Sequence, residues 1–351
     1  MWKSISHSAL IGLIILVSTS LNGQTSKIDS LRFSFKNQTN DYRKITTLNL
    51  LSREIYLIGK YDSSALCASD AKLLSEKLDY KKGIATAITN LGNVSMTSGD
   101  FDTALLNFEQ ARSLYKLIGD AKGIGASYNN IGNIHLSRGD YQTAQEHYYI
   151  SLKIRAKIKD KQGMADCFNN LGIINYYQAN FAVALKCYLA ALKILKEVGN
   201  KNGIARSYSN IGSIYLQQAD TENALESFTN GLKIQEEIND RMGMGRSYNN
   251  IASVFLYQGK YDESMENFLV ALKIKEEIGD YMSLGQTYLN IGNIYYVKIG
   301  DEKYDPDQRD SLMDRAHEYY YKSLEIFNAL GDKQAMSMAY NSIGTVHVSK
   351  S

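Results

Sequence analysis

One short motif returns every 40 residues along most of the chain, and a repeat of this length constrains the fold more than any other feature. The motif pairs an asparagine with a glycine or alanine two residues later, as in SYNNIGNIHL at residues 127–136. Six asparagines share the register: Asn90, Asn130, Asn170, Asn210, Asn250 and Asn290. A period of about 20–50 residues is typical of solenoids and repeat arrays, in which each unit packs on its neighbours.

Each repeat is predicted to form two amphipathic helices. In the third repeat Tyr128, Ile131 and His135 fall on one face of a helix, and Ala144 and Tyr148 fall on one face of a second helix. A Gly-Asp pair separates the two segments, because glycine can end a helix in the left-handed conformation and aspartate can cap the next one. The small residues let the paired helices approach closely, and the rings fill the space around them.

This pattern resembles the tetratricopeptide repeat family, whose unit combines an aromatic residue, a Leu-Gly pair, a ring, a Gly-Asp-Tyr turn, and then Ala, a ring and Ala. The matching residues in the third repeat are Tyr128, Ile131, Gly132, His135, Gly139, Asp140, Tyr141, Ala144, Tyr148 and Ser151. The family period is about 34 residues, so here the second helix is expected to continue for about another turn. The variant resembles the repeats of spindle-orienting adaptors and bacterial signalling proteins. The resemblance implies an all-α fold, a right-handed α-solenoid of antiparallel helix pairs.

The register divides the chain into predicted segments. Residues 1–23 are predicted to be a signal peptide and residues 24–42 an N-terminal capping helix. The array occupies 43–351, as repeats 43–82, 83–122, 123–162, 163–202, 203–242, 243–282 and 283–334 and an incomplete repeat 335–351. The seventh repeat holds 12 extra residues near 300–311, expected as a solvated loop in the turn between its helices. Because an array needs a polar cap at each end, we expect the natural product to continue or this chain to be a fragment.

The N-terminus has the layout of a secretory signal peptide. Lys3 precedes the apolar run Ala9–Val17, and small residues follow it. The run is too short to span a bilayer, so the sequence predicts an exported protein, periplasmic or extracellular, with no membrane span. Export permits disulfides. We expect Cys67, Cys167 and Cys187 to be small core residues, and a Cys167–Cys187 bridge stays open.

The first helix of each repeat carries a second face, away from the rings, that is polar and mostly uncharged. An asparagine side chain can both donate and accept hydrogen bonds, so it can hold the main chain of a peptide. The resemblance implies that the first helices line a concave groove where the family binds peptides. The predicted peptide-binding residues are Asn90, Asn130, Asn133, Asn170, Asn210, Asn250, Asn290, Arg206, Arg246, Tyr177 and Tyr257.

Two questions about this face stay open. The asparagines either bind a ligand or bond neighbouring helices and stabilise the stack, since both interpretations explain their regular spacing. Arg206 and Arg246 occupy the same register in adjacent repeats. They either clamp a carboxylate or lie solvated.

The sequence offers little for chemistry. The formal net charge of +2 argues against a nucleic-acid partner. The segments GIGASY and GMGRSY lack the third glycine of a dinucleotide fingerprint, and neither a phosphate loop nor His-Glu-x-x-His is present. The aspartates of the insert lack the spacing of a calcium loop. We therefore predict a protein that is not an enzyme and needs no cofactor or metal.

Two functional hypotheses follow. The first is a protein–protein interaction scaffold that binds a peptide segment in its groove. The alternative is the sensory or regulatory ectodomain of a bacterial signalling protein, whose histidine kinase, cyclase or DNA-binding output would follow Ser351 and is missing here. A third class, an envelope-processing or carbohydrate-processing enzyme, would need paired acidic residues in a cleft, and no such pair recurs along the repeats.

Overall fold

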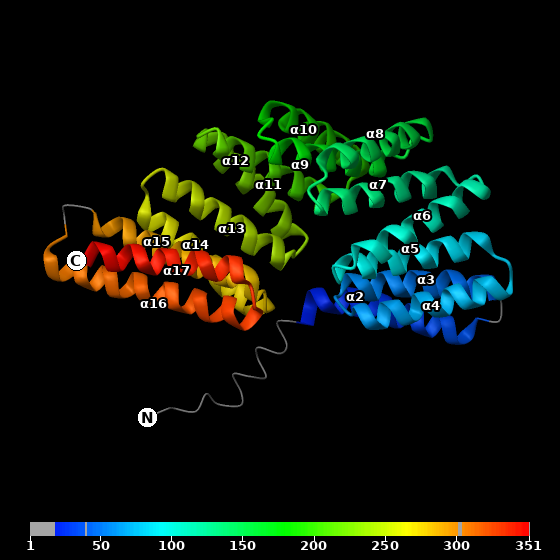
Figure 1. Cartoon of the computed structure of the whole chain (residues 1–351), viewed down its shortest axis with the longest axis horizontal. Helices are drawn as coiled ribbons and strands as arrows, with labels where there is room; N and C mark the ends of the chain where they lie inside the picture. The colour runs from blue at the N-terminus through cyan, green and yellow to red at the C-terminus, as the bar shows by residue number, and fades with distance from the viewer. Residues whose placement is uncertain (1–17, 39–40, 301–303, 351) are drawn as a thin grey trace, which may run out of the picture. The chain divides into compact units, whose positions relative to one another are not determined.

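The computed structural model of the chain describes residues 18–38, 41–300 and 304–350, and within these ranges every regular element is an α-helix (Figure 1). After α2 (Ser18–Asn37), the helices follow one another in antiparallel pairs, one pair to a repeat. The first helices are α3 (Asp41–Leu57), α5 (Lys81–Thr97), α7 (Ala121–Ser137), α9 (Lys161–Tyr177), α11 (Lys201–Gln217), α13 (Arg241–Tyr257), α15 (Tyr281–Ile299) and α17 (Lys333–Lys350). The second helices are α4 (Tyr61–Lys77), α6 (Phe101–Leu117), α8 (Tyr141–Lys157), α10 (Phe181–Val198), α12 (Thr221–Glu237), α14 (Tyr261–Ile278) and α16 (Pro306–Leu330).

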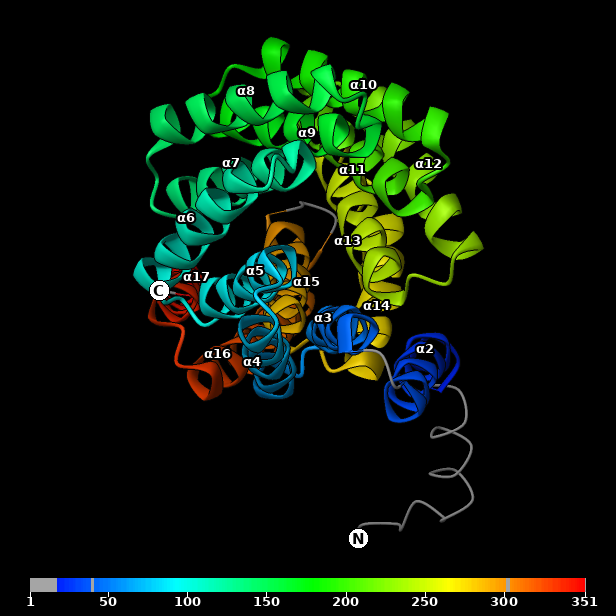
Figure 2. The ribbon, with the colours of Figure 1, turned by 90° about the vertical axis from the view of Figure 1, so that its right-hand side faces the viewer.

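The chain divides into two compact units, unit 1 (Met1–Gly199) and unit 2 (Asn200–Ser351). In each unit the first helices also contact one another, α3 with α5 and α7 with α9 in unit 1, and α11 with α13 and α15 with α17 in unit 2. The second helices do not approach one another as closely, so the first helices form the inner layer of each unit (Figure 2). None of the helices in the described part of the chain is long and apolar enough to cross a membrane.

The N-terminal helix begins earlier than predicted. Helix α2 starts at Ser18, inside the segment 1–23 that was interpreted as a signal peptide, and residues 1–17 lie outside the described residues. Its Ile28 packs with Leu51 and Ile55 of α3. The predicted capping helix 24–42 therefore corresponds to the C-terminal part of α2, which ends at Asn37.

The turns between helices use the residues that the repeat predicts. Gly99 and Gly139 have φ values of 80° and 75°, in the left-handed region that favours glycine. Asp140 then accepts a hydrogen bond from the backbone N–H of Thr143, 3.2 Å away, and so caps α8. Ala179 and Ala219 hold the same left-handed position in the next two repeats. Asp79, Lys159 and Asn239 are left-handed in the other turn, which follows the second helix.

The insert of the seventh repeat is more helical than predicted. Helix α15 continues to Ile299, and α16 already begins at Pro306, so residues 306–311 belong to a helix instead of a loop. Asp305 explains this start, because its side chain and that of Gln308 form a reciprocal capping box before a proline at the first helical position. Residues 301–303 lie outside the described residues.

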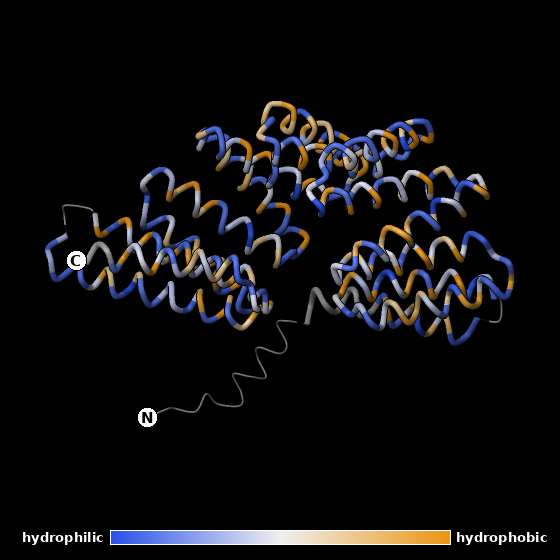
Figure 3. The backbone as a smooth tube through the Cα atoms, viewed as in Figure 1, coloured by the Kyte–Doolittle hydropathy of each residue, from blue (hydrophilic) through white to orange (hydrophobic). Residues whose placement is uncertain are grey.

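From α5–α6 to α15–α16, each helix pair is closed by a ring that rests on a small residue, whereas α4 has Ala68 at the ring position. Tyr148 of α8 is fully buried against Gly132 of α7, where a methyl group in place of the glycine hydrogen would lie 2.7 Å from the ring. Tyr148 also packs with Leu171 and Ile174 of the next repeat. Apolar and polar residues alternate along the helices that Figure 3 colours, as this one-sided burial requires.

A second buried position, which we call the inter-repeat slot, lies seven residues after the ring. Its side chain packs against the first helix of its own repeat and that of the next: Arg155 contacts both Gly125 and Gly163. The slot residue differs in every repeat but is always buried: Ser75, Tyr115, Arg155, Leu195, Gln235, Lys275 and Phe327. This position therefore distinguishes one repeat interface from another.

Candidate binding face on the first helices

The structure brings the predicted residues into two rows, one in each unit. We call this surface the first-helix face. Asn90, Asn130, Asn133, Asn170 and Tyr177 lie on α5, α7 and α9 of unit 1. Unit 2 carries its share on α11, α13 and α15: Asn210, Asn250, Asn290, Arg206, Arg246 and Tyr257. Each row follows from the 40-residue period, because equivalent residues of successive first helices face the same way.

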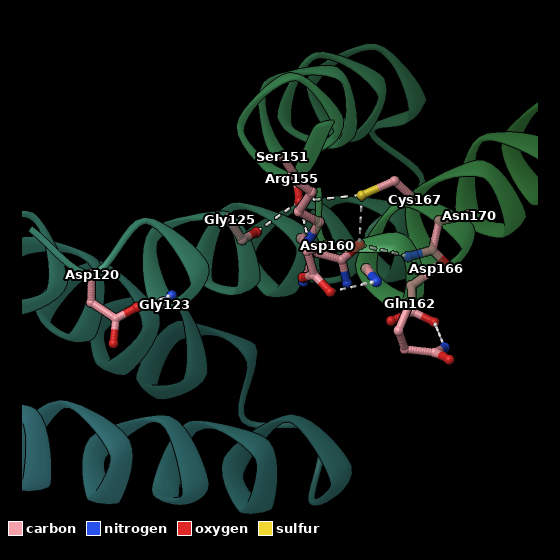
Figure 4. Close-up of polar contacts among 12 residues, drawn as sticks. Asp120, Gly123, Gly125, Ser151, Arg155, Asp160, Gln162, Asp166, Cys167 and Asn170 are labelled. Atoms are coloured by element: carbon pink, nitrogen blue, oxygen red, sulfur yellow. Dashed lines mark hydrogen bonds and ion pairs between the residues drawn. The ribbon is translucent and has the colours of Figure 1, made fainter. Parts of the chain in front are cut away.

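Two of the asparagines bond one repeat to the next. The side-chain amide of Asn170 donates to Oδ1 of Asn129 and to Oδ1 of Asn133, both 3.1 Å away in the preceding repeat (Figure 4 shows Asn170). The amide of Asn90, which is 9% exposed, donates to the backbone oxygen of Asn49 at 3.0 Å. These contacts favour the stacking interpretation for Asn90 and Asn170.

Other asparagines form hydrogen bonds within their own repeat. Oδ1 of Asn133 also accepts a hydrogen bond from the Tyr148 hydroxyl at 2.8 Å, and Oδ1 of Asn290 accepts one from Gln286 at 3.3 Å. Asn210 is half-buried. The asparagines of this row therefore do not all form the same hydrogen bonds.

Two asparagines are left for a ligand. Asn130 and Asn250 are half-buried at the same register, and their side chains form no hydrogen bond with any residue that the structure describes. A primary amide with both its donor and its acceptor available can pair with a peptide main chain without reading its side chains.

Arg206 and Arg246 lie exposed on the adjacent helices α11 and α13. Neither forms an ion pair within the described ranges. The one hydrogen bond at this place runs from Nε of Arg246 to the backbone oxygen of Met242, at 3.5 Å. Both guanidinium groups therefore remain available to an acidic group.

Charge is strongly partitioned between the two layers of unit 2. Helices α11, α13, α15 and α17 carry seven basic residues and no Asp or Glu. Helices α12, α14 and α16 carry fourteen acidic residues and six basic ones. Lys201, Arg241 and Lys298 pair with acidic residues of the second helices, whereas Arg206 and Arg246 lie exposed on the first-helix face.

The two predicted tyrosines stand at the C-terminal ends of their helices. Tyr177 is 63% exposed and stacks on Tyr141, with ring centroids 6.1 Å apart. Tyr257 is 61% exposed at the same register of α13. Their rings can cover apolar parts of a ligand, and their hydroxyls remain in water.

Sequence reasoning missed Lys275, the slot residue of α14. It is only 3% exposed, and its Nζ donates to Oγ1 of Thr287 at 2.7 Å and to Oδ1 of Asn249 at 3.3 Å. These acceptors are neutral, and burial lowers the pKa of Lys275 from 10.5 to about 8, with a smaller contribution of the same sign from Arg246. The available signal was a lysine four residues after the buried Ala271, on an otherwise apolar stripe.

A related polar cluster fills the slot of the third repeat (Figure 4). Nη1 of Arg155 donates to Oδ2 of Asp160 at 2.8 Å, and its Nε donates to the Ser151 hydroxyl at 3.1 Å. The thiol of Cys167 donates to the same hydroxyl at 3.2 Å, and burial raises the pKa of this thiol. All three cysteines are free thiols, so the optional Cys167–Cys187 bridge is not formed.

The family comparison agrees with this geometry. A family model described as Tetratricopeptide repeat matches four overlapping ranges, 83–157, 123–197, 164–237 and 203–277, which together span more than half of the chain. No curated protein sequence matches the chain.

Several solved structures share the fold. A signal transduction ATPase with a tetratricopeptide repeat sensor, from Pyrococcus horikoshii, aligns with a TM-score of 0.66 at 15% identity over 92% of this chain and 49% of its own. A Rap protein in complex with competence and sporulation factor aligns with a TM-score of 0.56 at 14% identity, over 95% of this chain and 98% of its own. BtubC from P. vanneervenii aligns with a TM-score of 0.55 at 20% identity, over 62% of this chain and 92% of its own.

These identities establish the fold alone, and the family follows from the sequence match together with the helix pairs that the structure contains. The chain belongs to the tetratricopeptide repeat family, whose helix pairs form protein-interaction scaffolds.

Proposed function

We propose that this protein is an exported, non-enzymatic scaffold that binds a peptide segment along the first-helix face. The observation that carries the proposal is the charge partition of unit 2, where Arg206 and Arg246 lie exposed and unpaired among helices that have no acidic residue. A ligand with acidic side chains would complement this face and avoid the acidic second helices.

In this proposal some asparagines bind the ligand and others stabilise the packing of the repeats. In unit 2 the available amide of Asn250 holds the peptide main chain, and in unit 1 Asn130 offers the same available amide. Asn90 and Asn170 instead keep the repeats in register. Neighbouring helices lie about 8–10 Å apart and an extended peptide advances about 3.3 Å per residue. Successive first helices within a unit would then meet roughly every third residue of the ligand.

A library of random peptides about a dozen residues long, displayed on phage, tests the proposal without knowledge of the natural partner. We expect selection on the full chain to enrich peptides with Asp or Glu. The double variant Arg206→Ala, Arg246→Ala should weaken the best peptide by about tenfold at low salt, and the difference should shrink as salt is raised. The matched control is Lys233→Ala, Lys273→Ala, which removes the same charge from exposed positions of the second helices.

Two results would refute the proposal. One is equal binding by the arginine variant and the wild type. The other is a stronger loss in the control variant, which would place the site on the second helices.

A second candidate function is the sensor part of a signalling protein. It is favoured by the structure from Pyrococcus horikoshii, in which a tetratricopeptide repeat array is described as the sensor of a signal transduction ATPase. Reading the gene beyond the codon for Ser351 separates the two candidates, since a kinase, cyclase or DNA-binding segment there would make this chain an input domain. Export is tested separately, because a cleaved signal peptide would leave a mature N-terminus near residue 24.

A further inference from the structure

The outer surface of α8 and α10, which we call the α8–α10 outer face, carries exposed apolar side chains. These second helices lie outside α7 and α9 in unit 1 (Figure 2). Tyr149 and Leu189 share one register of the repeat and are 53% and 46% exposed. Ile150 and Val183, on the same two helices, are 40% and 47% exposed. Single apolar side chains on a surface are ordinary, but a group on adjacent repeats indicates a contact surface.

Lysines lie beside these apolar side chains. Lys186 and Lys193 are exposed on α10, three residues before and four residues after Leu189, so they border this side chain on the helix surface. Lys153 is exposed on α8 at the register of Lys193. None of these three lysines forms an ion pair with a residue that the structure describes. Their charges are therefore available to an anionic partner.

Acidic side chains do not balance these lysines. Helices α8 and α10 each carry three basic residues and one acidic residue. The acidic residue of α10, Glu197, is already paired with Lys161 at 2.9 Å, and Glu146 of α8 accepts a hydrogen bond from Gln142. Of the six basic residues only Arg155 is buried, so the positive charge of the outer face comes from exposed lysines.

The packing of the repeats does not require this surface. Three exposed positions of α10 have polar or acidic equivalents in α12. The pairs are Val183 with Asn223, Lys186 with Glu226, and Leu189 with Thr229. Helix α12 nevertheless packs on α11 through the same contact of a ring with a glycine as α10 on α9. The apolar and basic residues of α10 are therefore surplus to the fold.

We propose that the α8–α10 outer face docks on the surface of an anionic lipid bilayer. Charge complementarity supports this occupant, because lysines near a bilayer are attracted to anionic headgroups. Apolar side chains beside them gain free energy by leaving water at the boundary of headgroups and acyl chains, and the aliphatic stem of a lysine can enter this boundary while its ammonium group stays in water.

The order of residues along α10 favours lipid over an acidic protein. Val183, Lys186, Leu189 and Lys193 alternate apolar and basic side chains, whereas the contact surface of a protein commonly has an apolar centre and a polar rim. The outer face belongs to the second helices and is separate from the first-helix face, so this proposal does not depend on the proposed function.

Co-sedimentation of the full chain with lipid vesicles tests the proposal. One set of vesicles is phosphatidylcholine, and the other is phosphatidylcholine and phosphatidylglycerol in equal parts. We expect binding to the anionic vesicles to be about tenfold stronger at low salt, and the difference should shrink as salt is raised. The two compositions are compared because the apolar run Ala9–Val17 can bind vesicles of either kind.

The lysines are tested with a charge-matched control. Lys186→Ala, Lys193→Ala should weaken binding to the anionic vesicles by about tenfold or more and leave binding to phosphatidylcholine unchanged. The control is Lys233→Ala, Lys273→Ala, which removes the same charge from exposed positions of α12 and α14 at the register of Lys193. This control should bind as the wild type does.

The apolar side chains are tested with residues that the repeat already uses. Val183→Asn, Leu189→Thr gives α10 the residues of α12 at the same register, and it should weaken binding to the anionic vesicles by about tenfold. Its unfolding midpoint should match that of the wild type, because both positions are exposed. Hydrogen–deuterium exchange of the wild type should become slower in α8 and α10 on anionic vesicles and stay unchanged in α12 and α14.

Three results would overturn the proposal. The first is equal binding of the wild type to both kinds of vesicle. The second is an equal loss in the lysine variant and its control. The third is binding of a soluble polyglutamate peptide that the lysine variant loses, without protection of α8 and α10 by vesicles, because an acidic protein would then be the occupant.

Discussion

At the scale of single residues, the asparagines that share one register of the repeat differ in their hydrogen bonding. Asn90 and Asn170 donate hydrogen bonds to the preceding repeat, whereas Asn130 and Asn250 form none with described residues. The 40-residue period predicts that these side chains lie in a row. It cannot predict which of them find a partner, because that depends on neighbouring side chains such as Asn129, which accepts from Asn170, and on the exact approach of the helices.

Replacing a bonded asparagine and replacing an unbonded one should therefore change the stability of the fold differently. Asn170→Ala removes two hydrogen bonds between repeats and should lower the free energy of unfolding by about 1–3 kcal/mol. Asn130→Ala removes none and replaces a mediocre helix former with the best one, so stability should stay the same or rise slightly. Urea denaturation followed by circular dichroism measures both. Equal losses for the two variants would mean that Asn130 braces the stack as well.

At the scale of helices, the sequence predicts the pairs and their turns because amphipathic periodicity and Gly-Asp signals are local. It is less successful where a helix is extended. The insert was predicted to be a loop because it is rich in aspartate, but α16 already starts at Pro306. Asp305 followed by proline is a helix start signal that the prediction did not use. The inter-repeat slot was missed for another reason: its residues differ in every repeat, so alignment of the repeats by their shared residues passes over it.

The slot residue Lys275 should make stability depend on pH. Its pKa is lowered to about 8 in the folded state, so at neutral pH the fold holds a charged amine that its surroundings disfavour. As pH rises from about 8 toward the unfolded value of 10.5, the folded state binds fewer protons than the unfolded state, and stability increases. Asp280 opposes the shift and Arg246 adds to it.

Lys275→Met should therefore be more stable than the wild type at pH 7, by about 1–3 kcal/mol. Thr287 and Asn249 keep a hydrogen bond to each other after the substitution, so no buried acceptor is stranded. Thermal unfolding of both proteins between pH 7 and pH 10 measures the difference, which should narrow as pH rises. A constant difference across this range would show that the lysine does not titrate there.

At the scale of the whole molecule, the sequence predicts the family and the solenoid, because six copies of one motif specify one packing mode six times. The candidate face follows from the same register, with Arg206 and Arg246 on adjacent helices. What the register does not show is the partition of charge, which emerges only when first and second helices are separated into layers.

The central claim is that the first helices hold the ligand, and hydrogen–deuterium exchange of the full chain tests it most directly. The exchange is measured with and without an acidic peptide selected from the displayed library. The account predicts slower exchange in α11 and α13, with no change in α12 and α14. Protection confined to α12 and α14, or protection that persists in the Arg206→Ala, Arg246→Ala variant, would contradict it.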